Sequence, residues 1–527
     1  MQEAIKIQEA DNVAVALENL SAGQAINIGQ EKFIIIEEIP VGHKFALEDL
    51  RTGSEVIKYG YSIGKAIQPI RTGAWVHTHN LKTGLGEVLK YHYNPSKVVW
   101  TSIIDNTKKA DNKTESVVNS VKESEDILKK TEDIPETVTQ YFEGFRRDNG
   151  KVGIRNEIWI IPTVGCVNDI ARLLEKKGRE YLNDEVEELV AFTHPYGCSQ
   201  LGEDHKNTQK ILCGLIEHSN AGGILVLGLG CENNNVDEMK KQLGTYDQNR
   251  VKFLICQECE DEIEQGTLLI KELISHASKF KREKINVNEL VIGLKCGGSD
   301  GLSGITANPV VGAFSDLLIA YGGTTILTEV PEMFGAETIL MNRCADHKLF
   351  EQTVELINNF KQYFIENNQL IYENPSPGNK KGGISTLEDK SLGCTQKSGT
   401  SPVRGVLKYG EQVSSHGLTL LAAPGNDLVA ATALAASGAH IILFTTGRGT
   451  PFGAPVPTIK ISSNTALAVK KKNWIDFDAG HLLENKNLAE LSVELYQLAV
   501  ATASGKKVKS EENGFRDIAI FKQGVTL

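Results

Sequence analysis

Apolar runs recur along the chain and divide it into regions of two kinds. In residues 1–95 the runs are short and β-branched, as in AINIG and KFIIIEEI, and turn sequences such as SAG, VGH and RTG separate them. This pattern predicts a small β domain. From residue 141 onward the runs are longer and alternate with helical patterns such as LVAATALAASG. Near-continuous apolar strands that alternate with helices are typical of parallel sheets buried on both faces.

The stretch between these regions differs in composition. Residues 107–140 are charged, polar and almost free of aromatic residues, which is typical of a linker. We therefore predict a β domain at 1–95, a charged linker at 96–140, an α/β domain at 141–285 and a C-terminal α/β domain at 286–527. The expected fold class is α/β, with a small N-terminal β domain followed by a larger region of two subdomains with mostly parallel sheets.

The apolar runs of the α/β region share one kind of ending. After the Val, Ile, Leu or Phe residues comes Gly, Pro or Cys and then a polar group, as in TVGCVND, HPYGCSQ and LGLGCENN. Glycine and asparagine in one such loop often serve only to turn the chain. Ligands of open parallel sheets bind at the carboxyl ends of the strands, so eight runs with this ending favour a site there. The small residues of KCGGSDGLSGITANP, 295–309, would let a ligand approach the backbone.

Charge and composition exclude several classes of protein. The 527 residues have a net charge of −11, whereas binding to nucleic acid or to a membrane surface requires a concentrated basic face. We expect neither partner. The N-terminal sequence has no signal-peptide pattern and no apolar run approaches the ~20 residues of a membrane helix, which predicts a cytoplasmic protein. Glycine-rich dinucleotide and P-loop motifs are missing, so no nucleotide cofactor is expected.

The nine cysteines are placed unevenly. A cytoplasmic chain keeps its thiols reduced, so disulfides are not expected. CQEC, 256–259, is a lone CxxC pair and does not predict a zinc site. Five cysteines adjoin a glycine at the end of an apolar run: Cys166, Cys198, Cys231, Cys296 and Cys394.

Acidic, basic and metal-binding side chains gather at the same strand ends. His77 and His79 are two residues apart on a predicted strand, so both would face one side and suit a metal ion. The guanidinium of Arg448 suits a carboxylate, and no GxSxG nucleophile motif is present. These residue types favour abstraction of a proton next to a carboxylate, with a divalent metal stabilising the enediolate.

Motifs along the whole chain resemble those of the altronate/galactarate dehydratase family. They are VHTHN, KVGIRNEIWI, TVGCVN, YGCSQLG, GLGCENN, CGGSDGLSGITANP, TEVPEMFGAE, YENPSPGNK, TLEDKSLGCTQK, TGRGTP and DFDAG. The resemblance implies an N-terminal SAF-type β domain. It also implies loss of water from D-altronate to give 2-dehydro-3-deoxy-D-gluconate, in hexuronate catabolism, with a divalent metal, Fe²⁺ or Mn²⁺. Galactarate is the alternative substrate, and its second carboxylate would need a second cationic clamp, for which Arg343 and Arg404 are candidates.

The expected mechanism assigns roles to residues as hypotheses. The substrate carboxylate and C2 hydroxyl would chelate the metal, while a base removes the C2 proton and an acid protonates the departing C3 hydroxyl. The catalytic candidates are His194, Tyr196 and Lys390. The substrate-binding candidates are Asn80, Gly297, Gly298, Ser299, Asp300, Ser303, Asn308, Asn426 and Arg448, and the metal-binding candidates are His77, His79, Cys198, Cys231, Glu232 and Cys296.

Two other interpretations remain. In the first, three of the five strand-end cysteines hold an iron–sulfur cluster in a cluster-dependent dehydratase. In the second, the chain is a non-catalytic carbohydrate-binding protein, since SAF-type domains also occur in binding proteins. A small sugar acid is the expected partner, and a homodimer is the commonest state of soluble enzymes of this kind.

Overall fold

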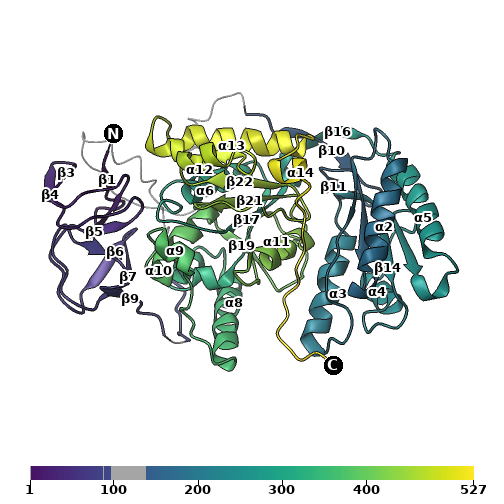
Figure 1. The fold of residues 1–527 in the computed structure, drawn as a ribbon, viewed down its shortest axis with the longest axis horizontal. Helices are drawn as coiled ribbons and strands as arrows, with labels where there is room; N and C mark the ends of the chain where they lie inside the picture. The colour runs from purple at the N-terminus through teal and green to yellow at the C-terminus, as the bar shows by residue number, and fades with distance from the viewer. Residues whose placement is uncertain (1, 87, 96–137) are drawn as a thin grey trace.

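The computed structural model describes residues 2–86, 88–95 and 138–527. Three domains lie in a row, with the N-terminal β domain at one end, the C-terminal domain in the middle and the second domain at the other end (Figure 1). The predicted linker, 96–140, falls almost entirely outside these residues. No helix in the described part of the chain is both long and apolar enough to cross a lipid bilayer.

The N-terminal domain consists of short antiparallel strands, which confirms the predicted β domain. One sheet has the order β1-β2-β5-β8, a second has the order β6-β7-β9, and β3 pairs with β4. The strands are β1 (Ala4–Ile5), β2 (Val13–Ala16), β3 (Ala25–Ile28), β4 (Glu31–Ile34), β5 (Lys44–Ala46), β6 (Glu55–Lys58), β7 (Tyr61–Ala66), β8 (Trp75–Val76) and β9 (Leu81–Lys82).

The VHTHN segment does not continue as a strand. β8 ends at Val76, and the backbone N–H of Asn80 donates to the carbonyl oxygen of His77 over 3.0 Å. The Asn80 side chain closes the same turn, because its oxygen accepts from the His77 backbone N–H over 2.9 Å. The prediction that His77 and His79 share a strand face is therefore wrong. An asparagine that binds the backbone three residues back favours a turn over a strand.

The second domain is built on a four-stranded parallel sheet of order β13-β12-β14-β15. Alternate residues of β12 face opposite layers: Ile158 and Ile160 pack with α2 and α5, whereas Trp159 and Ile161 pack with α3. A small antiparallel sheet, β11-β10-β16, adjoins it. The elements are β10 (Tyr141–Arg146), β11 (Val152–Gly153), β12 (Glu157–Pro162), α2 (Asn168–Gly178), β13 (Glu188–Ala191), α3 (Gly202–Ile216), β14 (Ala221–Gly228), α4 (Val236–Leu243), β15 (Val251–Ile255), α5 (Glu262–Ala277) and β16 (Arg282–Asn286).

The C-terminal domain has a seven-stranded sheet of order β19-β20-β18-β17-β21-β22-β23, parallel throughout. Its strands are β17 (Val291–Cys296), β18 (Thr324–Leu327), β19 (Val403–Leu407), β20 (Gly417–Leu421), β21 (Ile441–Thr446), β22 (Thr458–Ser462) and β23 (Phe477–Asp478). Its helices are α6 (Ala307–Ala320), α7 (Glu337–Met341), α8 (His347–Glu366), α9 (Pro377–Lys381), α10 (Leu387–Cys394), α11 (Asp427–Ala436), α12 (Thr465–Lys470), α13 (Leu488–Ala503) and α14 (Lys509–Glu512). The predicted fold class is confirmed.

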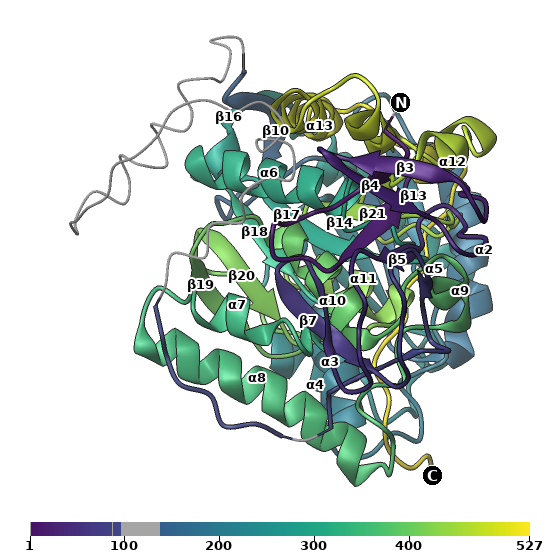
Figure 2. The same cartoon turned by 90° about the vertical axis from the view of Figure 1, so that its left-hand side faces the viewer.

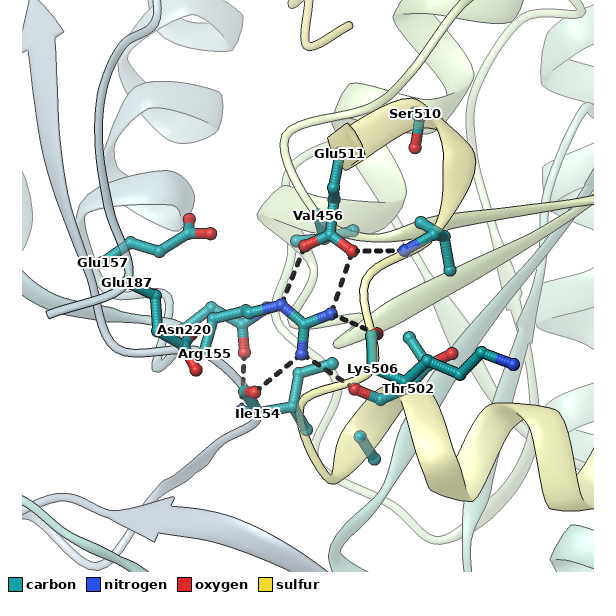
Figure 3. A network of polar contacts seen from close by, with 12 residues as sticks. Ile154, Arg155, Glu157, Glu187, Asn220, Val456, Thr502, Lys506, Ser510 and Glu511 are labelled. Carbon is teal, nitrogen blue, oxygen red and sulfur yellow. Dashed lines mark hydrogen bonds and ion pairs between the residues drawn. The ribbon is translucent and has the colours of Figure 1, made fainter. Parts of the chain in front are cut away.

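The second and C-terminal domains share a buried boundary. α3 packs so closely on α11 that a Cβ atom on Gly214 would lie 2.4 Å from the backbone oxygen of Ala436. Nearby, the guanidinium of Arg155 donates to both carboxylate oxygens of Glu511, over 2.8 and 2.9 Å, and to the Thr502 carbonyl oxygen (Figure 3). The boundary therefore combines apolar packing with a buried bidentate ion pair.

Candidate active site

The carboxyl end of the C-terminal sheet carries two thiols and a carboxylate. Cys296 ends β17, Glu332 lies in the 3-10 turn η6 (Val330–Met333) that follows β18, and Cys394 ends α10. The Cys296 thiol donates to Glu332 Oε2 over 2.9 Å, and its sulfur lies 3.4 Å from that of Cys394. All three residues are buried, and one ligand atom of each lies within 4.8 Å of the others. We call Cys296, Glu332 and Cys394 the thiol–carboxylate centre.

Two lysines contact this centre. Lys397 Nζ donates to Cys296 Sγ over 2.9 Å, and Lys390 Nζ pairs with Glu332 Oε1 at 2.7 Å. Burial alone would raise the pKa of Glu332, but the charges of Lys390 and Lys397 lower that pKa to about 2. The hydrogen bond with Cys394, together with burial, raises the pKa of the Cys296 thiol. The carboxylate is therefore ionised while the Cys296 thiol keeps its proton.

Glu329 supports the centre from a strained backbone. Its φ of 69° lies in the left-handed region, which few residues other than glycine adopt. The Glu329 carboxylate accepts from the Cys296 backbone N–H over 2.9 Å and from Lys295 Nζ over 2.6 Å. Strain of about 1–3 kcal/mol that the surrounding contacts enforce is common at functional sites.

A small cavity lies beside the centre. Its wall includes Lys390 and Cys394 of α10 and, from the N-terminal domain, Lys58 and Tyr59. Tyr59 also has a left-handed backbone, with φ of 61°. Four of the predicted substrate-binding residues line this cavity: Ser299, Asp300, Ser303 and Asn308. The Ser299 hydroxyl is buried and has no hydrogen-bond partner among the described residues, so it is available to a ligand.

The N-terminal domain holds α10 in place. β7 lies against α10 (Figure 2), and the Thr386 hydroxyl, just before α10, donates to the Ile63 carbonyl oxygen over 2.6 Å. Lys44 and Lys58 both pair with Asp389, at 2.8 and 2.9 Å, and all three side chains are at most 2% exposed. Burial lowers the pKa of Lys44 to about 8, against the opposing charge of Asp389. Because Asp389 immediately precedes Lys390, this contact fixes the segment that forms the cavity wall.

The other predicted substrate-binding residues are Asn80, Gly297, Gly298, Asn426 and Arg448. Gly298 has a φ of 62°, and its carbonyl oxygen accepts from the backbone N–H groups of Gly447 and Arg448 over 3.1 Å each. The Gly297 N–H donates to the Thr445 carbonyl oxygen, and the Asn426 side chain caps α11. These contacts shape the loops at the sheet edge. The guanidinium of Arg448 is exposed and donates to the carbonyl oxygen of Gly378 over 3.3 Å.

The six predicted metal ligands are spread over three domains. Cys296 belongs to the thiol–carboxylate centre. His77 and His79 lie in the N-terminal domain, where the His77 ring stacks on Trp75 and its Nδ1 lies 3.0 Å from Ser385 Oγ. Burial is the main reason that the pKa of His77 falls to about 3. The other three, Cys198, Cys231 and Glu232, lie in the second domain, which the C-terminal domain separates from the N-terminal one (Figure 1). The structure does not bring the six residues to one ion.

Two of the three catalytic candidates lie away from the cavity. His194 and Tyr196 follow β13 in the second domain. His194 Nε2 lies 2.8 Å from the Pro162 carbonyl oxygen, and its Nδ1 accepts from the Tyr196 backbone N–H over 3.2 Å. Burial lowers the pKa of His194 to about 4, so the ring is neutral at pH 7 and both nitrogens already have partners. The third candidate, Lys390, lines the cavity.

Several residues of the site were not among the predicted catalytic, substrate-binding or metal-binding candidates. Glu332 and Cys394 carried a signal, because each stands in a motif at a strand or helix end, TEVPEM and SLGC. Lys58, Asp389 and Lys397 carried none. Lys58 and Asp389 are 331 residues apart in the chain, and no periodicity or spacing joins them.

The donor set of the thiol–carboxylate centre fits a divalent transition metal. Thiolate ligands suit Fe²⁺ and Zn²⁺, and a carboxylate also suits Mn²⁺. Three such donors converge here and are buried, and metal binding would release the thiol protons. Cys296, Glu332 and Cys394 are therefore residues that could hold such an ion.

Family models match three parts of the chain. The model of the altronate/galactarate dehydratase SAF domain matches residues 2–84. The model of the D-galactarate dehydratase/altronate hydrolase second domain matches 144–278, and that of the D-galactarate/altronate dehydratase C-terminal domain matches 287–526.

Curated relatives match over almost the full length. The chain is 49% identical over 526 residues to altronate dehydratase of Escherichia coli (strain K12), covering 99% of each chain. It is 51% identical over 530 residues to altronate dehydratase of Bacillus subtilis (strain 168), covering 100% of each. Identity to galactarate dehydratase (L-threo-forming) of Escherichia coli (strain K12) is 31% over 521 residues, covering 95% of this chain and 93% of the other. The chain belongs to the altronate/galactarate dehydratase family.

Proposed function

We propose that the chain dehydrates D-altronate to 2-dehydro-3-deoxy-D-gluconate and water. The observation that carries this proposal is the thiol–carboxylate centre beside a cavity whose wall includes Lys390. The choice of altronate over galactarate is supported by sequence identity of 49% and 51% to two altronate dehydratases, against 31% to a galactarate dehydratase.

We propose Fe²⁺ or Mn²⁺ as the metal, with Cys296, Glu332 and Cys394 as ligands. When bound, the divalent cation would stabilise the negative charge that develops on the substrate carboxylate as C2 loses its proton. Two sulfur donors favour Fe²⁺ over Mn²⁺, which prefers oxygen ligands.

Residues of the cavity wall bind the substrate and move a proton. Although burial favours the neutral amine, the adjacent Glu332 carboxylate raises the pKa of Lys390 above its usual range. An ammonium group at this position attracts the aldonate carboxylate and can protonate the departing C3 hydroxyl. The Ser299 hydroxyl, which is buried and has no hydrogen-bond partner in the described part of the chain, would bond a substrate hydroxyl. Lys58 and Tyr59 cover the cavity from the N-terminal domain and help to exclude water.

Turnover by the full-length protein tests the substrate and the metal together. The protein is stripped of metal and assayed with D-altronate and with galactarate, each with and without Fe²⁺ or Mn²⁺. Metal-dependent formation of a 2-keto-3-deoxy acid from D-altronate is the expected result. Turnover of galactarate alone would show that galactarate is the substrate in place of D-altronate. No turnover of either acid by the metal-loaded protein would overturn the proposal.

A pair of matched variants tests the centre itself. Glu332→Gln removes the charged ligand, and we expect weaker Fe²⁺ binding and a kcat at least about 100-fold lower. Glu337→Gln is the control, because Glu337 forms an equally buried ion pair with Lys361, at 2.8 Å, outside the cavity wall. Equal loss of kcat in the two folded variants would show that the effect is not specific to Glu332 and would contradict its role as a metal ligand.

A further inference from the structure

Three exposed thiols of the second domain have no role in the proposed reaction. Cys166 lies in the 3-10 turn η2 (Gly165–Val167) after β12, Cys198 follows β13 and Cys231 follows β14. All three are free and exposed. Free cysteines are usually buried in folded proteins, and an exposed thiol is open to oxidation and other reactions. Three at the ends of neighbouring strands therefore need an explanation.

The sheet brings the three cysteines to one edge. β12 is the neighbour of both β13 and β14, and all three strands run parallel. Neighbouring strands are about 4.8 Å apart, so three adjacent strand ends span roughly 10 Å. The carboxyl ends are also level, since Ile160 pairs with Ala191 and Pro162 pairs with Leu227.

Hydrogen bonds tie the three loops to one another. The Gly165 N–H donates to the Tyr196 carbonyl oxygen over 2.9 Å, which joins the Cys166 turn to the Cys198 loop. The Asn234 N–H donates to the Gly197 carbonyl oxygen over 3.1 Å, which joins the Cys198 loop to the Cys231 loop. Ser199, next to Cys198, has a left-handed backbone with φ of 59°. The loops are thus held in a fixed arrangement at some cost in backbone strain.

The same loops contain buried polar atoms that lack partners. Within the described residues, Asn234 Oδ1 and Gln200 Nε2 are buried and make no hydrogen bond. Asn234 is 0% exposed and Gln200 is 4% exposed. Buried polar atoms without partners are rare in native proteins and often mark a missing ion or ligand.

Two helices begin at the cysteine loops without side-chain caps. α2 starts two residues after Cys166 and α3 starts four residues after Cys198, and neither N-cap side chain accepts a hydrogen bond from the helix. The helix dipole favours a negatively charged group at these ends. A metal cluster with thiolate ligands carries such a charge.

The spacing of the sulfurs distinguishes a cluster from a single ion. Two ligands of one ion with metal–sulfur bonds of about 2.3 Å lie at most about 4.6 Å apart. The sulfurs of Cys166, Cys198 and Cys231 do not all lie within 4.8 Å of one another. A group with several metal atoms can bind each sulfur at a different atom and so span a wider triangle.

We propose that Cys166, Cys198 and Cys231 bind a [4Fe–4S] cluster in the second domain. When a preformed cluster binds, three of its iron–thiolate bonds to small-molecule thiolates break and three new bonds to Cys166, Cys198 and Cys231 form. The three protein thiol protons pass to the departing thiolates, and no electrons are transferred. The fourth iron has no cysteine ligand. This site is separate from the thiol–carboxylate centre, whose Cys296 and Cys394 thiols lie in the C-terminal domain.

Anaerobic reconstitution of the full-length protein with sulfide and equal amounts of ferrous and ferric iron tests the proposal, because a [4Fe–4S]²⁺ cluster contains iron in both oxidation states. We expect about four irons and four acid-labile sulfides per chain and a broad visible absorption band. Cys166→Ser, Cys198→Ser and Cys231→Ser should each lose most of the bound sulfide and the band. Circular dichroism and the thermal midpoint check that these variants fold, which exposed Cys→Ser changes should permit.

Two controls separate this site from the rest of the protein. Cys213→Ala changes a buried cysteine of α3 in the same domain and should leave the cluster content unchanged. Cys296→Ser should lose turnover and keep the cluster, so failure of this proposal is distinguishable from failure of the proposed reaction. Iron bound without sulfide, sulfide retained by a variant lacking all three exposed thiols, or cluster loss in Cys296→Ser would each overturn it.

Discussion

His194 shows how a buried histidine can be mistaken for a catalytic one. HPYGCSQ places it beside Tyr196 and Cys198 at a strand end, where proton-transfer groups are common. In the structure its ring bridges the Pro162 carbonyl oxygen and the Tyr196 backbone N–H. The ring therefore stabilises the loop, and the sequence alone does not distinguish that role from catalysis.

His194→Gln tests which role applies. A glutamine amide can donate to Pro162 and accept from Tyr196, so we expect kcat to stay within about twofold and stability to fall by roughly 1 kcal/mol. His194→Leu removes both of these contacts and should lower the free energy of unfolding by about 1–3 kcal/mol for each contact. Turnover and urea unfolding of both variants are the measurements. A folded His194→Gln enzyme that has lost turnover would restore the catalytic role.

At the scale of elements, α10 connects the domains to the reaction. Glu388 accepts from the Gly84 N–H over 2.7 Å, Asp389 holds two lysines of the N-terminal domain, and Lys390 pairs with Glu332. Every residue of α10 is buried, from Leu387 to Cys394. The segment LEDKSLGC therefore lacks the one-sided apolar pattern that reveals a surface helix. From the sequence alone, the charged residues Glu388, Asp389 and Lys390 would be assigned to a solvent-exposed helix face.

Asp389→Asn should loosen this connection. The change leaves Lys44 and Lys58 buried without a counter-charge, and breaking a buried ion pair typically costs 3–5 kcal/mol. We expect a lower urea midpoint and a raised KM, because Lys58 and Lys390 line the same cavity. Glu283→Gln is the control, since Glu283 pairs with Arg146 at the surface, where the Arg146 side chain is 42% exposed and that of Glu283 53%. This change should alter the free energy of unfolding by no more than about 0.5 kcal/mol. Equal midpoints for the two variants would contradict this account.

The strands and their ends were the predictable part of these elements. Continuous apolar runs identified the parallel sheets, and the glycine-rich segment after β17 lines the cavity through Ser299, Asp300 and Ser303. The hydrophobic pattern of the sequence did not predict which loops lie next to one another. Glu332 and Cys394 reach Cys296 because β18 neighbours β17 and α10 ends beside it. Sheet order and helix placement depend on long-range packing, which local spacing does not encode.

At the scale of the whole molecule, the central domain carries the proposed chemistry and both neighbours are fixed to it by buried charge. The N-terminal domain is held through Asp389, and the second domain through Arg155 and Glu511. The predicted homodimer stays a prediction. The two buried ion pairs suggest that domain attachment depends on pH, because carboxylates that are paired in the folded state must take up protons when acid unfolds them.

Glu511 makes this dependence measurable (Figure 3). Burial would raise its pKa, but the hydrogen bonds and charge of Arg155 lower it below the ordinary value of 4.5. A carboxyl whose folded pKa is depressed adds stability above the unfolded pKa, and this stability is lost as pH falls through the folded pKa. Glu511→Gln should therefore lower the urea midpoint at pH 7, by the equivalent of about 3–5 kcal/mol. The difference from the unmodified protein should shrink as pH falls below about 4.5.

The neighbouring residue supplies the control for this experiment. Glu512 pairs with Lys509 at the surface, with side chains 48% and 36% exposed, so Glu512→Gln removes a charge one position away without opening the domain boundary. The free energy of unfolding of Glu512→Gln should match that of the unmodified protein within about 0.5 kcal/mol at every pH. If the effect of Glu511→Gln stayed constant from pH 7 to pH 4, the loss would reflect packing around Arg155. A pH-dependent difference confined to Glu511→Gln would instead identify the ionised carboxylate as the group that joins the second domain to the C-terminal one.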